Sequence, residues 1–109
     1  MNVLVIPEVQ AYLQKLVQIL YWKGYFSYED TARKYVKNLY DDIKTNLPKL
    51  QHKPAPKHYD KYGKELYYAV FRKNRHTHYY AFFSKYIDNG ETFYVVCYIG
   101  NNHTDAQYL

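Results

Sequence analysis

Hydrophobic residues recur at helical spacing in the amino-terminal half of the chain. The apolar run NVLVI, residues 2–6, is followed by Pro7 and then by a stripe made of Val9, Leu13, Leu16, Val17 and Leu20. A second stripe comprises Ala32, Tyr35, Val36, Leu39, Tyr40, Ile43 and Leu47. Spacings of three and four residues place such side chains on one face of a helix. The pattern predicts a strand, a helix over 7–23, and a second helix that Ser27 caps and Pro48 ends.

The pattern changes to that of strands in the carboxy-terminal half. Three segments rich in aromatic and β-favouring residues, LYYAVFR, RHTHYYAFFS and TFYVVCYI, are separated by the polar sequences KN and DNG. They predict an antiparallel meander with strands at 66–72, 75–84 and 92–99. Residues 48–64 contain three of the four prolines and no hydrophobic period, so we expect an ordered or semi-ordered loop there.

These elements predict an α+β fold in the order β-α-α-β-β-β. The helical hairpin is expected to pack on one face of a small, mainly antiparallel sheet and to leave the other face free. At 109 residues the chain is expected to form a single domain over 1–109. It has no apolar run long enough for a membrane helix and no secretory signal, so we expect no membrane association and a cytoplasmic location.

Positive charge is concentrated in the middle of the chain. The formal net charge is +5, and residues 49–78 carry eight lysines and arginines against two acidic residues. Four of the five histidines lie in the same window, interleaved with tyrosines. Cations that neutralise phosphates and aromatic faces on which bases stack indicate a nucleic-acid surface. The expected contacts are Lys53, Lys57, Lys61, Lys64 and His76. A lysine-rich solvated loop beside a tyrosine-rich core is the alternative interpretation.

Histidines and arginines cluster around the second strand of the meander. His76 and His78 alternate along that strand and share a face, Arg72 and Arg75 lie near them at the hairpin, and His103 follows the last strand. Imidazoles transfer protons near neutral pH and arginine braces a phosphate, which suits cleavage of RNA by its own 2′-hydroxyl without a metal. A zinc triad of His76, His78 and His103 stays open as an alternative, as do ordinary polar residues on a solvated sheet face.

The order of elements and the ending YIGNNHTDAQYL resemble the RelE/ParE superfamily of bacterial toxins. The likeness covers essentially the whole chain, and the NNH…AQYL ending is its most specific part. It implies that residues of the sheet's free face and of the carboxy-terminal segment act on ribosome-bound messenger RNA. It also implies that Tyr108 sits near the scissile phosphate, that Asn102 occupies a position commonly basic, and that His103 is the nearest titratable substitute.

The resemblance implies the toxin half of a type II toxin–antitoxin pair, with a cognate acidic antitoxin and no cofactor. The acid–base candidate is His103, with His78 as its substitute, whereas Arg72 and Arg75 would hold the phosphate. The usual central arginine of the superfamily falls at Thr77, or at His78 after a slip of one residue. A DNA gyrase inhibitor without nuclease activity, as in other members, and a catalytically silent RNA-binding module therefore stay open as alternatives. The segment NNHTDAQYL is expected to be ordered against the basic side of the sheet.

Overall fold

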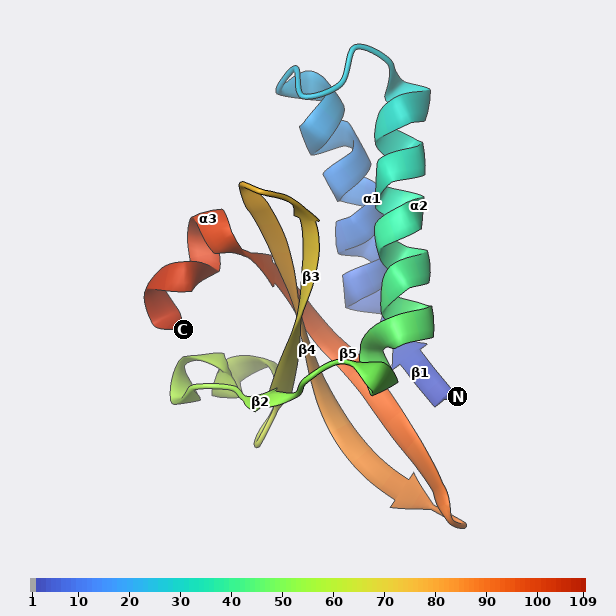
Figure 1. Cartoon of the computed structure of the whole chain (residues 1–109), viewed down its shortest axis with the longest axis vertical. Helices are drawn as coiled ribbons and strands as arrows, with labels where there is room; N and C mark the ends of the chain where they lie inside the picture. The colour runs from blue at the N-terminus through green and yellow to red at the C-terminus, as the bar shows by residue number, and fades with distance from the viewer. Residues whose placement is uncertain (1) are drawn as a thin grey trace.

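A computed structural model describes residues 2–109 and contains five strands and three α-helices within that range. In chain order the elements are β1 (Asn2–Val5), α1 (Pro7–Trp22), α2 (Glu29–Asn46), η1 (Leu47–Lys49), β2 (Lys53–Pro54), η2 (Lys57–Tyr62), β3 (Tyr67–Asn74), β4 (Thr77–Asp88), β5 (Glu91–Asn101), α3 (Asn102–Asp105) and η3 (Ala106–Tyr108). Figure 1 shows the α1–α2 hairpin on one side of the sheet, with η2 and α3 on the other.

The strands form one mixed sheet in the order β1-β5-β4-β3-β2. β1 pairs parallel with β5, and every other neighbouring pair is antiparallel. The predicted α+β fold and the order of its main elements are therefore confirmed. The meander strands extend beyond their predicted ends, because the pairing of β4 with β5 continues to the Asn89–Gly90 turn. Both turn residues have positive φ, as a two-residue hairpin of this type requires.

The helical hairpin and the sheet enclose the main hydrophobic core. The apolar stripe of α1 and that of α2 pack on Ala69, Phe71, Tyr79, Ala81 and Phe83, which alternate along β3 and β4. Pro7 occupies the first turn of α1, as predicted, but the predicted cap of α2 is wrong. Its N-cap is Tyr28, and no side chain caps the helix. None of the helices in residues 2–109 is both long and apolar enough to cross a bilayer.

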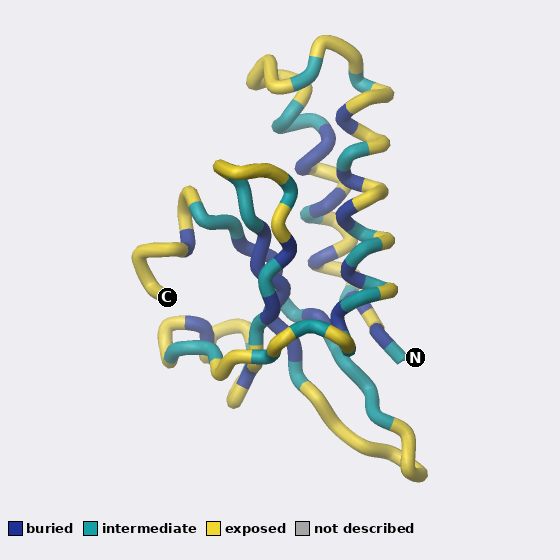
Figure 2. The backbone as a smooth tube through the Cα atoms, in the orientation of Figure 1, coloured by how far each residue is buried: buried dark blue, intermediate teal, exposed yellow. Residues whose placement is uncertain are grey.

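The sheet face opposite the helices, called the far face below, is not free. A second cluster of buried residues, made of Tyr59, Leu66, Tyr80 and Phe82, lies on it. Tyr59 belongs to η2 and stacks on Phe82 of β4, with ring centroids 4.1 Å apart. The predicted loop at 48–64 thus contains a short strand and a 3-10 helix, because Pro56 starts a turn that inserts an aromatic side chain into the sheet. Figure 2 shows the buried residues running along the strands between the two layers.

Candidate nucleic-acid interface

The C-terminal segment, residues 101–109, is ordered, as the sequence predicts, and from Asp105 onward it lies on the far face. The side-chain oxygen of Asn101 accepts hydrogen bonds from the backbone N–H of His103 (2.9 Å) and of Thr104 (3.1 Å). This cap starts α3, and the chain continues directly into η3. An asparagine oxygen is among the best acceptors for the first amides of a helix, so the polar ending turns the chain sharply as soon as β5 ends.

Asp105 anchors the C-terminal segment to the core. It is 4% exposed and is the buried charged residue of the described chain. One carboxylate oxygen accepts from the Tyr59 hydroxyl (2.9 Å), and the other accepts from the backbone N–H of Asn101 (3.0 Å) and the hydroxyl of Thr104 (2.9 Å). A Cβ at Gly100 would overlap this carboxylate, so only glycine fits there. The segment is thereby tied to both β5 and η2.

The tyrosines around Asp105 are held in their neutral form. Burial raises the pKa of the Tyr59 hydroxyl well above its usual range, and the hydrogen bond to the Asp105 carboxylate raises this pKa further. Burial likewise raises the pKa of Tyr98, which lies beside the same carboxylate. A neutral hydroxyl is a donor, whereas a phenolate beside a carboxylate would be repelled. These hydroxyls therefore remain hydrogen-bond donors that fix Asp105.

The end of the C-terminal segment stacks on η2. The rings of Tyr108 and His58 are parallel, with centroids 3.6 Å apart and an interplanar angle of 9°. The Lys61 ammonium lies 3.5 Å from Nε2 of His58. Lys57 also belongs to η2, and Lys53 and Lys64 flank it on the chain; all four lysines are exposed. The structure thus gathers an aromatic pair and a group of exposed cations around η2.

Arg72 and His78 face each other across the β3–β4 pair. The antiparallel register places them directly opposite each other, so their side chains share the far face with Val70 and Tyr80. Arg72 is exposed and His78 is half-buried. Nδ1 of His78 is buried without a hydrogen-bond partner in residues 2–109.

Asn102 has a structural contact with β4. Its side-chain oxygen accepts from the backbone N–H of His78 (2.8 Å), and its amide nitrogen donates to the carbonyl of His76 (3.0 Å). The side-chain amide of Asn102 therefore bonds the backbone of β4 as a backbone amide of β5 would, and it continues the β4–β5 ladder by one step. It holds the C-terminal segment beside the Arg72–His78 pair. The predicted nucleic-acid contact through Asn102 competes with these two hydrogen bonds.

His103 lies apart from the other candidates. Its Nε2 is 3.5 Å from the hydroxyl of Thr77, and both residues line a cleft of about 510 Å³ between the helical hairpin and the end of the sheet. His78 points to the opposite face. Arg75 and His76 form the exposed turn between β3 and β4, which begins at Thr77, so the prediction that His76 shares a strand face with His78 is wrong. Within residues 2–109 no three histidine, cysteine or acidic side chains come together as metal ligands, so the zinc triad is not assembled.

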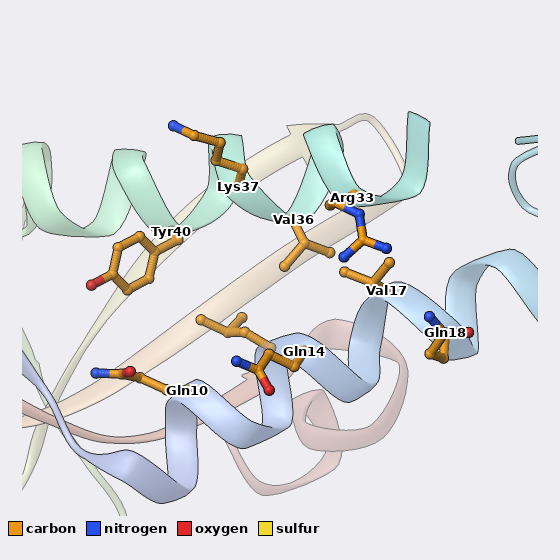
Figure 3. A pocket seen from close by; sticks show the side chains of 9 residues that line it. Gln10, Gln14, Val17, Gln18, Arg33, Val36, Lys37 and Tyr40 are labelled. Atoms are coloured by element: carbon orange, nitrogen blue, oxygen red, sulfur yellow. The ribbon is translucent and has the colours of Figure 1, made fainter. Parts of the chain in front are cut away.

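The outer seam of the helical hairpin forms a separate groove of about 460 Å³. Figure 3 shows Gln14 of α1 pointing toward α2, Gln10 and Gln18 of α1 on either side of it along the groove, and Lys37 pointing away. Arg33 already pairs with Glu29, and Lys37 with Asp41, each one turn away on α2. The polar groups that line this groove are therefore mainly glutamine amides and cations already paired with acidic side chains. The lysines around η2 differ, because they are exposed and, within residues 2–109, carry unpaired charge available to a phosphate.

Sequence reasoning missed the residues that hold the C-terminal segment against η2. Tyr59, His58 and Asp105 lie in stretches without hydrophobic periodicity, and their contacts join positions far apart in the chain. The local signal was the pair of prolines in PAPKHYDKY, which is typical of a turn. Comparison of the chain with models of known protein families, with curated proteins and with solved structures found no match.

Proposed function

We propose that the protein is the toxin component of a type II toxin–antitoxin pair and a metal-independent endoribonuclease that acts on ribosome-bound messenger RNA. One observation carries the proposal: the Arg72–His78 pair, the anchored C-terminal segment and the lysines around η2 all lie on the far face or at its border. Phosphate binding, base stacking and proton transfer are thereby available on one side of the sheet.

We assign the acid–base role to His78 rather than to His103, because His78 is directly opposite an arginine. In the proposed reaction Nε2 of His78 takes the proton of a 2′-hydroxyl. The resulting oxyanion attacks the adjacent phosphorus, and the 5′-oxygen leaves with a proton from water. The products are a 2′,3′-cyclic phosphate and a 5′-hydroxyl. Arg72 neutralises the charge that develops on the phosphate, and Tyr108 stacks on a flanking base.

The proposed partner in the cell is an acidic antitoxin, which the net charge of +5 favours by complementarity. Its binding would mask the exposed cations around η2 and so compete with RNA. A gene for a small acidic protein beside the gene for this chain would support this part of the proposal. Gyrase inhibition remains the rival function, and it requires no proton transfer.

The test is a cleavage assay with purified ribosomes and a defined message, in excess chelator. We expect the wild-type protein to cleave, and we expect His78→Gln to cleave about 100-fold more slowly or worse, as for loss of a general acid or base. His103→Gln is the matched control, because it makes the same substitution at a histidine that lines the cleft between the helical hairpin and the end of the sheet. We expect it to retain most of the activity.

Three results would contradict the proposal in different ways. Cleavage lost in chelator would exclude the metal-independent mechanism. A larger loss with His103→Gln than with His78→Gln would move the site to the cleft beside Thr77. No cleavage by the wild-type protein, together with inhibited supercoiling by gyrase, would favour the gyrase inhibitor.

A further inference from the structure

Several stretches of strand edge within residues 2–109 have no neighbouring strand, among them residues 69–74 of β3, which lie beyond its pairing with β2. The outer edges of β1 and β2 are protected. On β1 the Lys44 ammonium donates to the carbonyl of Val3 (2.6 Å), and the Gln10 amide donates to that of Val5 (3.0 Å). β2 is two residues long and ends in Pro54, which has no N–H. Such features prevent another strand from pairing with an edge.

A further unpaired stretch is the distal edge of β4, residues 84–88, where the only features of a protected edge are the charges of Lys85 and Asp88. β3 stops pairing at Tyr67, opposite Phe83. Glu65 adopts a left-handed conformation (φ 53°) and Leu66 packs into the second cluster, so the chain leaves the plane of the sheet there. Figure 1 shows the β4–β5 ribbon projecting beyond the other elements. None of the side-chain hydrogen bonds of residues 2–109 reaches the backbone of Lys85 or Ile87.

The hairpin turn determines which backbone groups point outward. A two-residue turn makes Asp88 and Glu91 a hydrogen-bonded pair, and bonded pairs alternate along an antiparallel ladder. Tyr86 and Ser84 therefore bond to β5. The N–H and C=O groups of Lys85 and Ile87 point away from β5, along the unpaired edge. This edge can accept the backbone of one further extended strand.

Two large hydrophobic side chains are exposed on this edge, beside the charged Lys85 and Asp88. Ile87 is 72% exposed and Tyr86 is 46% exposed. Tyr86 stacks on Phe93 of β5, with ring centroids 5.3 Å apart and an angle of 12° between the rings. A second ring could continue this stack on the edge side of Tyr86. The edge therefore offers apolar contacts as well as backbone hydrogen bonds.

We propose that this edge pairs with the same edge of a second copy of the chain, antiparallel and centred on Tyr86. In that register Lys85 lies opposite the partner's Ile87, so the outward backbone groups of both copies bond to each other. Ser84 lies opposite the partner's Asp88, which its hydroxyl can reach. Tyr86 meets the partner's Tyr86, and the two stacked pairs join into one aromatic row. The edge is complementary to itself, and the sheet continues through both copies.

The register makes a sharp distinction between neighbouring positions. Tyr86 and the partner's Tyr86 form a non-hydrogen-bonded pair, whose Cα atoms are about 4.5 Å apart, within the range that a disulfide spans. Ile87 lies opposite the partner's Lys85, two residues along the strand from the partner's Ile87. The Cα atoms of the two Ile87 residues are therefore about 8 Å apart, beyond that range. Cysteines at these two positions therefore report on the register.

The experiment introduces Tyr86→Cys, Ile87→Cys or Trp22→Cys separately into a Cys97→Ser background and follows oxidation to the cross-linked dimer. Trp22 is 75% exposed at the tip of the helical hairpin and controls for random collision. We expect Tyr86→Cys to cross-link at least about tenfold faster than both controls, because pairing raises its effective concentration. We also expect sedimentation to show a concentration-dependent dimer of the wild-type chain.

Ile87→Pro removes an outward N–H and leaves the bonds to β5 intact, so we expect it to sediment as a monomer with an unchanged circular dichroism spectrum. The proposal is overturned if the wild-type chain stays monomeric at every concentration, which would leave the edge to a different protein. It is also overturned if Ile87→Cys or Trp22→Cys cross-links as fast as Tyr86→Cys. Neither result bears on RNA cleavage.

Discussion

The two faces of the sheet are covered in different ways. On the helical side, two long helices bury aliphatic side chains such as Leu39 and Ile43, both 0% exposed. On the far face the cover is short, and it is held by tyrosine rings, the buried carboxylate of Asp105 and a tight fit at Gly100. The helical side supplies most of the burial that stabilises the fold. The short elements on the far face keep a polar, basic surface ordered. Long helices packed on that face would bury this surface.

The largest expected effect on stability comes from the helical side. Leu39→Ala leaves a cavity under α2, and we expect a loss of about 2–5 kcal/mol in the free energy of unfolding. Urea denaturation measures this loss. Without urea, and well below the temperature of unfolding, the folded variant should still cleave RNA at the wild-type rate. A variant that is stable but inactive would show that the two faces are not separate in role.

A smaller loss of stability, with a local signature, is expected from Asp105→Asn. Loss of the carboxylate weakens the hydrogen bonds from Tyr59 and Thr104, at a cost of about 1–3 kcal/mol. We expect hydrogen exchange to accelerate in residues 101–109 before it changes in α1 or α2. Asp60→Asn, which alters an exposed acid on η2, is the matched control and should change neither. Equal protection of the segment in both variants would refute the anchoring role.

Replacement of Lys53, Lys57, Lys61 and Lys64 by glutamine should affect binding with little effect on stability. If the lysines bind phosphates, the log–log slope of ribosome or RNA affinity against salt should fall by about one for each phosphate that is no longer neutralised. Replacement of four exposed lysines of the helical hairpin by glutamine, at Lys15, Lys23, Lys34 and Lys37, removes the same number of charges and controls for the change in net charge. A slope that falls equally in the control would mean that the lysines around η2 act only through total charge.

The smallest expected effect is a change in alkaline sensitivity. Tyr59 and Tyr98 have folded pKa values above their usual value of 10.0, so the folded state retains protons that the unfolded state releases. Their contribution to stability is complete below about pH 10 and falls as the pH rises above it. Urea denaturation from pH 8 to pH 11 should show this loss, and Tyr59→Phe should reduce its slope. If the slope of stability against pH is the same in Tyr59→Phe as in the wild-type chain, residues other than Tyr59 cause the loss of stability at high pH.

The sequence predicts the layers of this fold better than the details of its site. Helical and strand periodicities are local, so α1, α2 and the meander follow from the chain itself. The parallel pairing of β1 with β5 and the stacking of Tyr108 on His58 join distant residues, and no local pattern encodes them. The facing of Arg72 and His78 could be anticipated from alternation, whereas the separation of His103 depended on the capping turn at Asn101.

The central claim is that messenger RNA lies on the far face, and site-specific photo-cross-linking on the ribosome tests it most directly. A photoreactive phenylalanine derivative would replace either Tyr108 or Trp22, and each variant would be irradiated on ribosomes that carry a labelled message. Trp22 is the more exposed of the two, at 75% against 42%, so exposure alone favours the control. We expect cross-links to the message from position 108 and none above background from position 22. Cross-links to the message from position 22 alone would contradict the claim.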